Sequence, residues 1–190
     1  MWLDENKRAK GHEFYSLAAM KISTNDQLMA SAEDTISRRQ YKIRIMDLDS
    51  GEFYPEVIEN TSGQIVWAND NKTLFYVRKH PTTLLPYQVY RHELGTSPDQ
   101  DQLIYEEKDT TFYTGIFKTR SDNLIGIGVS STMSSEYRFV SADMPTGAFE
   151  GFWPREAEHR YSLYHLSFIN ILTCRRPTLL KSRRGALLST

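Results

Sequence analysis

The stretch QIVWANDNKTLFYVRK, residues 64–79, holds two short apolar runs on either side of the polar turn Asn69-Asp70. β-Branched and aromatic residues favour strands, and Asn and Asp favour turns because their side chains bond nearby backbone groups. Two similar stretches lie before and after it, MKISTNDQLMASAED at residues 20–34 and IFKTRSDNLIGIGVSS at residues 116–131. Each of the three stretches therefore predicts two strands joined by a tight turn.

These stretches are the first half of a longer repeat. Their turn aspartates stand at Asp26, Asp70 and Asp122, which gives spacings of 44 and 52 residues. A second series of strand-like segments follows them, and its tyrosines are spaced by 46 and 50 residues. The alternation of apolar and polar residues in these segments is typical of strands with one buried face. We therefore predict an all-β fold with three copies of a four-stranded unit, in which the second series comprises residues 40–57, 86–107 and 136–154 with Tyr41, Tyr87 and Tyr137.

A repeat of this length with four strands is typical of a β-propeller blade. A β-sandwich with irregular loops is the alternative, but the aligned turns and tyrosines favour blades. Closed propellers have four to eight blades, so three copies indicate part of a larger ring or an open arc.

The charge of the chain is unevenly distributed. The whole sequence has 23 basic and 24 acidic residues, a formal charge of -1, which argues against a generally basic nucleic-acid binder. All the acidic residues fall within residues 1–158, whereas residues 159–190 hold six Lys or Arg and no acid. We therefore divide the chain into a propeller part, 1–158, and a segment 159–190 that starts a further blade and ends in a basic tail. The tail is either an arm for nucleic acid or membrane, or a segment foreign to the fold.

No motif for catalysis or metal binding stands out. The chain has no G-x-S-x-G nucleophile motif, and its histidines have no ligand spacing. Asp47, Asp49 and Gly51 resemble a calcium loop only faintly, and a strand-connecting turn is the better interpretation. We expect no catalytic residue, metal or cofactor on this chain. We interpret three further sets of residues as structural: the histidines His12, His80, His92, His159 and His165; the lone Cys174; and the basic clusters Arg38-Arg39 and Arg78-Lys79-His80. We expect the two basic clusters on a solvated rim.

Apolar runs are short and the N-terminus is charged. The longest runs, such as residues 124–129, fall far short of the ~20 residues that cross a bilayer. The start MWLDENKRAK is too charged for a signal peptide, and a single Cys cannot build a disulfide framework. These features lead us to expect a cytoplasmic protein.

Long strings of this sequence resemble one family of peptidases. GHEFYSL (11–17), AEDTISRRQYKIR (32–44), VWANDNKTLFYVRKHPTTLLPYQVYRHELGTSPDQDQLIYEEKD (66–109) and HRYSLYH (159–165) resemble oligopeptidase B, also called protease II. That enzyme belongs to the prolyl oligopeptidase family of serine peptidases. The resemblance covers most of the chain, and its strings are much longer than a short motif.

The resemblance implies a fold and an activity for the intact relatives. It implies that this chain is an early part of a seven-bladed propeller that covers an α/β-hydrolase domain. That hydrolase would carry a Ser–Asp–His triad and cleave short peptides after Lys or Arg, while the propeller keeps out large folded proteins. The implied partners are short basic peptides and the hydrolase domain, with no nucleic acid and no membrane. The alternative is a non-enzymatic β-rich module that binds another protein.

The resemblance also bears on both ends of the chain. Glu13 matches a family position near the interface between propeller and hydrolase, where it would pair with a basic group; it is equally an ordinary strand-end carboxylate. After His165 the family pattern stops, and LSFINILTCRRPTLLKSRRGALLST follows. The loss of acids, the gain of Arg and the sudden Cys suggest a frameshifted gene with an internal start at Met1.

The frameshift hypothesis can be tested in the DNA. We expect the sequence beyond codon 165, in one of the other two frames, to encode an F-x-I-x-T-N-like strand and further blades. If neither frame restores such a strand, the hypothesis is wrong.

Overall fold

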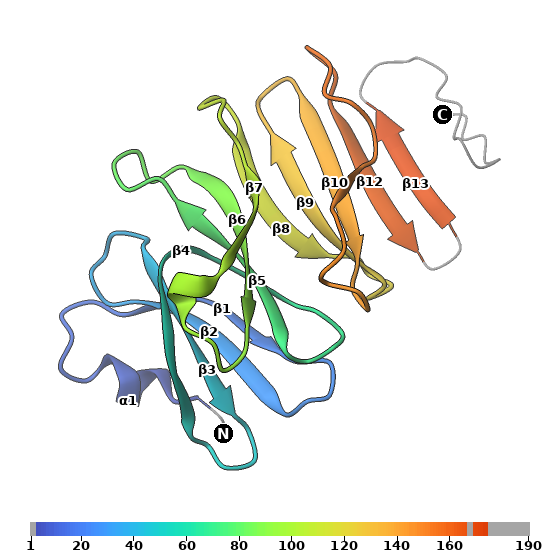
Figure 1. Cartoon of the computed structure of the whole chain (residues 1–190). Helices are drawn as coiled ribbons and strands as arrows, with labels where there is room; N and C mark the ends of the chain where they lie inside the picture. Colours follow the sequence, from blue (N-terminus) through green and yellow to red (C-terminus); the bar gives the residue numbers. More distant parts are fainter. Residues whose placement is uncertain (1–2, 167–168, 175–190) are drawn as a thin grey trace.

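The computed structural model describes residues 3–166 and 169–174, and its regular structure is nearly all antiparallel β-strand (Figure 1). Strands that follow each other in the chain also pair with each other, so each sheet is a meander. The all-β prediction is confirmed. The elements are α1 (Glu5–Ala9), β1 (Ser16–Ile22), β2 (Leu28–Asp34), β3 (Tyr41–Asp47), β4 (Phe53–Trp67), β5 (Thr73–Lys79), β6 (Pro86–Glu93), the 3-10 helix η1 (Pro98–Gln100), β7 (Gln102–Glu106), β8 (Tyr113–Lys118), β9 (Leu124–Ser130), β10 (Ser135–Ser141), β11 (Glu150–Gly151), β12 (Tyr161–Leu166) and β13 (Ile169–Cys174).

Three four-stranded blades follow one another, as the repeat predicted. Blade 1 comprises β1, β2, β3 and the first part of β4; blade 2 comprises the rest of β4 with β5, β6 and β7. Blade 3 comprises β8 to β11, and the β12–β13 hairpin follows it. The division at residue 158 stays a prediction, and the tail 175–190 lies outside the described residues.

Strand β4 joins the first two blades without a break. It is 15 residues long, and its pairing passes from β3 to β5 at Thr61. Asn60 and Gly63 have φ angles of 59° and 87° at this point, so the backbone bends there. A Cβ on Gly63 would lie 2.6 Å from the Cβ of Ala18 in β1, so only glycine allows the close approach of the two strands.

Stacked sheets provide the core. In β5, Leu74 and Tyr76 face blade 1, whereas Phe75 and Val77 face blade 3, because successive strand residues point to opposite faces. This strand is buried on both faces, which explains its continuous apolar run. The interface of blades 1 and 2 is formed by Leu28, Ala30, Ala32, Ile43, Ile45, Ile58, Ile65, Trp67, Leu74 and Tyr76. The interface of blades 2 and 3 is formed by Val66, Ala68, Phe75, Val77, Val89, Phe112, Ile116, Ile125, Ile127, Val129, Val140 and Ala142.

The three repeated turns have the same backbone hydrogen bonds, and these bonds correct the sequence alignment of the second turn. The amides of Asp26, Asn71 and Asp122 donate to the carbonyls of Ser23, Ala68 and Thr119, respectively. All three turn residues have a φ between 56° and 59°. Asn71, not Asp70, is therefore the equivalent of Asp26 and Asp122. The reason is that Asn tolerates the left-handed conformation as well as Asp does.

The two outer faces of the arc differ. The face of blade 1 away from blade 2 is covered in part by α1, whose Arg8 donates to the Glu33 carboxylate at 2.6 Å and 2.9 Å and lies over the Phe53 ring. On blade 3, the face away from blade 2 has glycines under aromatic rings. A Cβ on Gly126 would come within 2.5 Å of Phe117. The hairpin β12–β13 meets this face through Tyr161, whose ring centroid lies 5.3 Å from that of Tyr137 in β10.

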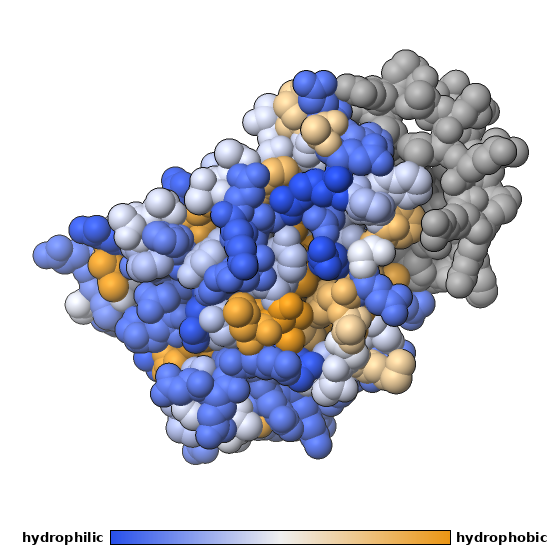
Figure 2. All heavy atoms as spheres, turned by 45° about the horizontal axis from the view of Figure 1, so that its top comes forward, coloured by the Kyte–Doolittle hydropathy of each residue, from blue (hydrophilic) through white to orange (hydrophobic). Residues whose placement is uncertain are grey.

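The blades form an arc, with the N-terminal blade at one end and β12–β13 at the other (Figure 1). The surface view shows a hydrophobic patch near the centre of the visible face, surrounded by hydrophilic residues (Figure 2). Open sheet edges and apolar faces of this kind promote association.

We therefore expect the isolated chain to self-associate at micromolar concentration. The edge strands and the exposed apolar side chains provide the contact surfaces. Size-exclusion chromatography with light scattering measures this directly. A monomer with a single cooperative melting transition would contradict the expectation.

Candidate interdomain rim and channel face

Each antiparallel blade has two rims. We call the rim where the first strand of each blade starts the proximal rim; it carries residues 13–16, 34–41, 79–86, 106–113 and 130–135. We call the other the distal rim; it carries the three repeated turns. An antiparallel blade with four strands starts and ends on the same side, so the chain passes from blade to blade at the proximal rim.

Hydrogen bonds join the three turns of the distal rim. The Asn25 amide donates to Asn71 Oδ1 at 2.9 Å, which links blade 1 to blade 2. The Asn69 side-chain amide donates to the Asp122 carbonyl at 3.0 Å and to Asp143 Oδ1 at 2.7 Å, which links blade 2 to blade 3. These bonds fix the spacing of neighbouring blades at this end.

Lys118 spans all three blades on the same rim. Its ammonium in blade 3 donates to Asn69 Oδ1 at 2.6 Å and to Thr24 Oγ1 of blade 1 at 3.4 Å. Burial lowers the pKa of Lys118 and outweighs the opposing effect of the Asp122 and Asp143 carboxylates. The indole of Trp67 donates to the Lys21 carbonyl at 3.0 Å. Lys21, Thr24, Trp67 and Lys118 line a groove of about 550 Å³ between the first strands of the three blades.

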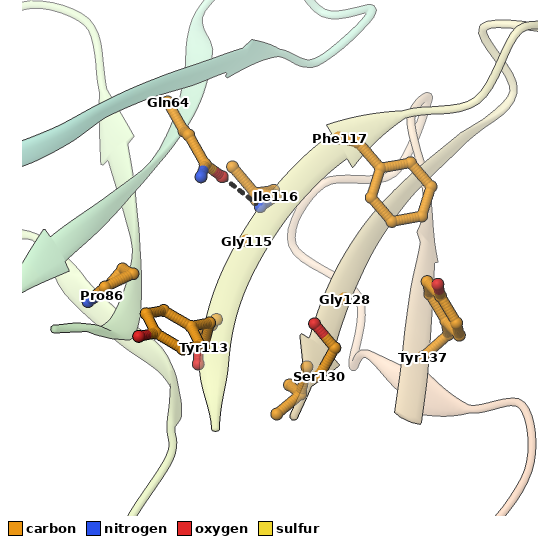
Figure 3. Close-up of a pocket in the computed structure, with 11 residues that line it drawn as sticks. Gln64, Pro86, Tyr113, Gly115, Ile116, Phe117, Gly128, Ser130 and Tyr137 are labelled. Carbon is orange, nitrogen blue, oxygen red and sulfur yellow. Dashed lines mark hydrogen bonds between the residues drawn. The ribbon is translucent and has the colours of Figure 1, made fainter. Parts of the chain in front are cut away.

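The first strands of the blades also meet near the proximal rim. The side chain of Gln64 in β4 points to β8 and accepts a hydrogen bond from the Ile116 amide at 2.8 Å (Figure 3). Tyr113 and Pro86 lie on one side of the same groove, and Phe117 and Tyr137 on the other (Figure 3). Since the first strands of consecutive blades are neighbours, we assign this surface to the wall of the propeller channel.

Exposed apolar side chains gather on the proximal rim. Glu13 lies there, exposed, in the bend before β1. Of the eight large hydrophobic side chains that are exposed among the described residues, only Met144 belongs to a connection at the distal rim. The proximal rim has Phe14, Ile36, Tyr113 and Met133.

The two basic clusters found in the sequence come together on the proximal rim. Lys79 Nζ donates to the Arg39 carbonyl at 2.6 Å and lies over the Tyr41 ring. Burial, followed by the charge of Arg39, lowers the pKa of Lys79. The carboxylate of Asp34 orders the intervening loop by accepting from the amides of residues 36, 37 and 39. Neither cluster alone indicated that they would share one surface.

Arg155 clamps blades 2 and 3 together at their outer side. Its guanidinium bonds the Glu107 carboxylate and, at 3.1 Å, the carboxylate of Glu136 in β10. Tyr105 donates to Glu107 at 2.8 Å. Burial alone would raise the pKa of Glu107, but the bonds from Arg155, the Asp109 amide and Tyr105 outweigh it and lower that pKa.

A buried polar cluster links blades 1 and 2. His92 is fully buried, and its Nδ1 lies 2.7 Å from Asp101 Oδ1. The Tyr76 hydroxyl donates to the other Asp101 oxygen at 2.7 Å, and burial together with this carboxylate raises the tyrosine pKa. Glu56 of blade 1 accepts from the Gly95 amide at 2.9 Å and lies 4.0 Å from His92 Nε2. The His–Asp pair resembles part of a catalytic triad, but Nε2 faces a carboxylate, so the cluster has a structural role.

The other residues considered from the sequence lie in a turn and at a strand end. The Asp47 carboxylate accepts hydrogen bonds from the Asp49 amide and from the amide and hydroxyl of Ser50, so it orders its own turn. Cys174 is the last residue of β13. In the described part of the chain, no group of three or more His, Cys, Asp or Glu side chains is arranged to hold a metal ion. None of the helices described there is long and apolar enough to span a membrane.

The fold and the two rims define a propeller domain, and comparison with known proteins gives its family. Residues 1–176 match the family model described as "Prolyl oligopeptidase, N-terminal beta-propeller domain". The chain belongs to this family of propeller domains.

Individual relatives of the chain agree with this family assignment. The chain is 44% identical over 164 residues to dipeptidyl aminopeptidase BI of Pseudoxanthomonas mexicana. The aligned region covers 86% of this chain and 22% of that protein. It is 32% identical over 147 residues to Protease 2 of Moraxella lacunata, and the aligned region covers 75% of this chain and 21% of that protein. The structure of oligopeptidase B from Leishmania major matches with a TM-score of 0.81 and 27% identity, over 86% of this chain and 23% of that one. The chain thus spans about a fifth of the length of these curated relatives.

The Arg155 clamp makes a testable contribution to stability. We expect Arg155→Met to lower the free energy of unfolding by about 1–3 kcal/mol, because it removes charged hydrogen bonds to two buried carboxylates. The control Lys42→Met breaks an exposed pair with Glu59 and should cost less than about 1 kcal/mol. Urea titration at submicromolar concentration, followed by pulse proteolysis, measures both.

The same titration has a pH dependence. Because the Glu107 pKa is lowered in the folded chain, its stabilisation is present above the ordinary glutamate value of about 4.3 and is lost as the pH falls below it. Arg155→Met should reduce this loss on the acid side. An identical pH profile for the parent chain and the variant would contradict the role of the clamp.

Proposed function

We propose that this chain is the propeller part of an oligopeptidase B-like serine endopeptidase that hydrolyses short peptides after Lys or Arg. The observation that carries the proposal is the family match over residues 1–176, together with 32% identity to a protein named Protease 2. The likeness to oligopeptidase B from Leishmania major supports the specificity for basic residues. The propeller limits substrate size by narrowing access to the hydrolase, and the assembled enzyme acts in the cytoplasm.

The hydrolase domain docks on the proximal rim in this proposal. A chain that runs through antiparallel blades enters and leaves the propeller at that rim, so both covalent links to the hydrolase lie there. The exposed apolar residues on the rim, Phe14, Ile36, Tyr113 and Met133, suit a domain interface. Glu13 stands on the same rim and pairs with a basic group of the hydrolase.

The chain alone is inactive in this proposal. The sequence has no G-x-S-x-G motif, and the buried His92 is turned toward Glu56. Catalysis therefore requires a hydrolase domain, which supplies the nucleophile, the base and the carboxylates that bind the basic side chain of the substrate.

A second activity has its own support. The relative with 44% identity is named a dipeptidyl aminopeptidase, so removal of dipeptides from a free N-terminus is the competing function. A non-enzymatic module that binds a protein through the proximal rim is the third candidate, favoured by the exposed apolar side chains there.

Complementation separates these functions. We expect the purified chain to leave an N-terminally blocked Arg-Arg fluorogenic peptide intact, and co-expression with the remaining blades and hydrolase domain of a family member to restore its cleavage. Cleavage of a dipeptide substrate with a free amino group, but not of the blocked peptide, would instead establish the aminopeptidase. A stable complex that cleaves neither substrate would support the binding module and contradict both peptidase functions.

Glu13 has its own test in the complemented enzyme. Glu13→Arg should lower activity several-fold and change its salt dependence, because it replaces an attractive interdomain charge by a repulsive one. Glu52→Arg, the same change at an exposed position on the distal rim, is the matched control and should leave both unchanged. Equal kinetics and equal salt dependence for the two variants would contradict the proposed interdomain role of Glu13.

A further inference from the structure

A groove of about 400 Å³ lies near the proximal rim and extends from the free edge of β8 across blade 3 (Figure 3). Blade 2 provides Gln64 and Pro86 beside the free edge. Blade 3 provides residues of β8, among them Tyr113, Thr114 and Ile116, and further residues of β9 and β10. β8 is an edge strand, because β9 alone pairs with it in the four-stranded sheet. Its outer backbone groups therefore face the groove and the channel.

The Gln64 side chain takes the place of an added strand. Its carboxamide oxygen accepts from the Ile116 amide at 2.8 Å, on the side of β8 away from β9 (Figure 3). A carboxamide has the same polar groups as a peptide bond, so this contact is one step of a β-ladder. Hydrogen bonding alternates along an antiparallel strand, so the backbone of Thr114 faces the same side as that of Ile116.

The Thr114 hydroxyl is the second observation that indicates a ligand. Thr114 is only 2% exposed and lines the groove. Its Oγ1 has no hydrogen-bond partner among the described residues. Buried hydroxyls are almost always paired, so this covered and unpaired hydroxyl is a hydrogen-bonding group that a ligand entering the groove could satisfy.

The walls of the groove are uncharged and partly open. Gly115 leaves space for the carboxamide, since a Cβ there would lie 3.1 Å from Gln64 Oε1. Tyr113 is 60% exposed at the open end. None of the lining residues carries a charge, so the groove is suited to a peptide backbone more than to a charged side chain.

We propose that the groove binds an extended peptide, whose main chain pairs with the free edge of β8 and displaces the Gln64 carboxamide. This inference rests on the proposed function, because it assigns the bound peptide to the substrates of the peptidase. A strand of about three residues fits between Tyr113 and Ile116 at ~3.3 Å per residue. The contact is independent of sequence, so selection for Lys or Arg belongs to the hydrolase domain.

A peptide pair tests the backbone contact. The full chain is immobilised at low density, which prevents self-association, and surface plasmon resonance measures a capped peptide of alternating Thr and Val. The control peptide has the same side chains with alternate nitrogens methylated, so it cannot form a ladder. We expect the unmethylated peptide to bind at least about tenfold more tightly, as expected for several lost backbone hydrogen bonds.

Two variants assign the binding to this groove. Gln64→Ala removes the competing carboxamide and should tighten binding about threefold to tenfold, a gain that misfolding does not produce. Thr114→Val removes the unpaired hydroxyl at nearly constant volume and should weaken binding by a similar factor. Gln88→Ala is the matched control, since Gln88 bonds Glu106 outside the groove.

Equal affinity for the two peptides, or an unchanged affinity in Gln64→Ala, would overturn the inference. The assay needs no hydrolase and no cleavage. A failed complementation experiment would therefore count against the proposed function alone, and a failed binding experiment against this groove alone.

Discussion

The packing of one sheet on the next is the interaction on which the structure depends. Strand β5, the second strand of blade 2, is buried on both faces, with Tyr76 against blade 1 and Phe75 against blade 3. A single small sheet cannot bury such residues, so each blade requires a neighbour. The glycines follow from the same constraint: Gly63 lets two first strands approach, and Gly126 leaves room for the aromatic rings on the outer face of blade 3.

Polar contacts then fix how the stacked sheets are aligned. Lys118 and the Asn side chains hold the distal rim, Arg155 holds the outer side of blades 2 and 3, and the His92 cluster holds blades 1 and 2. The proximal rim is different, because there the chain presents apolar side chains and a cluster of bases to solvent. Both rims therefore hold neighbouring blades together, and the exposed apolar side chains distinguish the proximal rim.

The sequence was sufficient for the fold because its turns are local. An Asn or Asp between two apolar runs determines a tight turn by itself, so three turns predicted three blades. It was not sufficient for residue equivalence. The residue at the left-handed position of the second turn is Asn71, not Asp70. The tyrosines are not fully equivalent either. Tyr137 pairs with Gly128 in β9 and lies two residues further along its strand than Tyr41 and Tyr87 do along theirs. The contacts of His92 with Asp101, of Lys79 with Arg39, and of Gln64 with Ile116 depend on how strands and blades pack, which local patterns do not encode.

If the proximal rim faces a hydrolase domain, as we propose, lysines on both rims allow a direct measurement. Lys79 and Lys108 lie on the proximal rim, whereas Lys72 and Lys118 lie on the distal rim. Lysine cross-linking and mass spectrometry of the chain co-expressed with a hydrolase domain should give interdomain links from Lys79 and Lys108. Links that come instead from Lys72 and Lys118 would place the hydrolase on the opposite side and contradict the account.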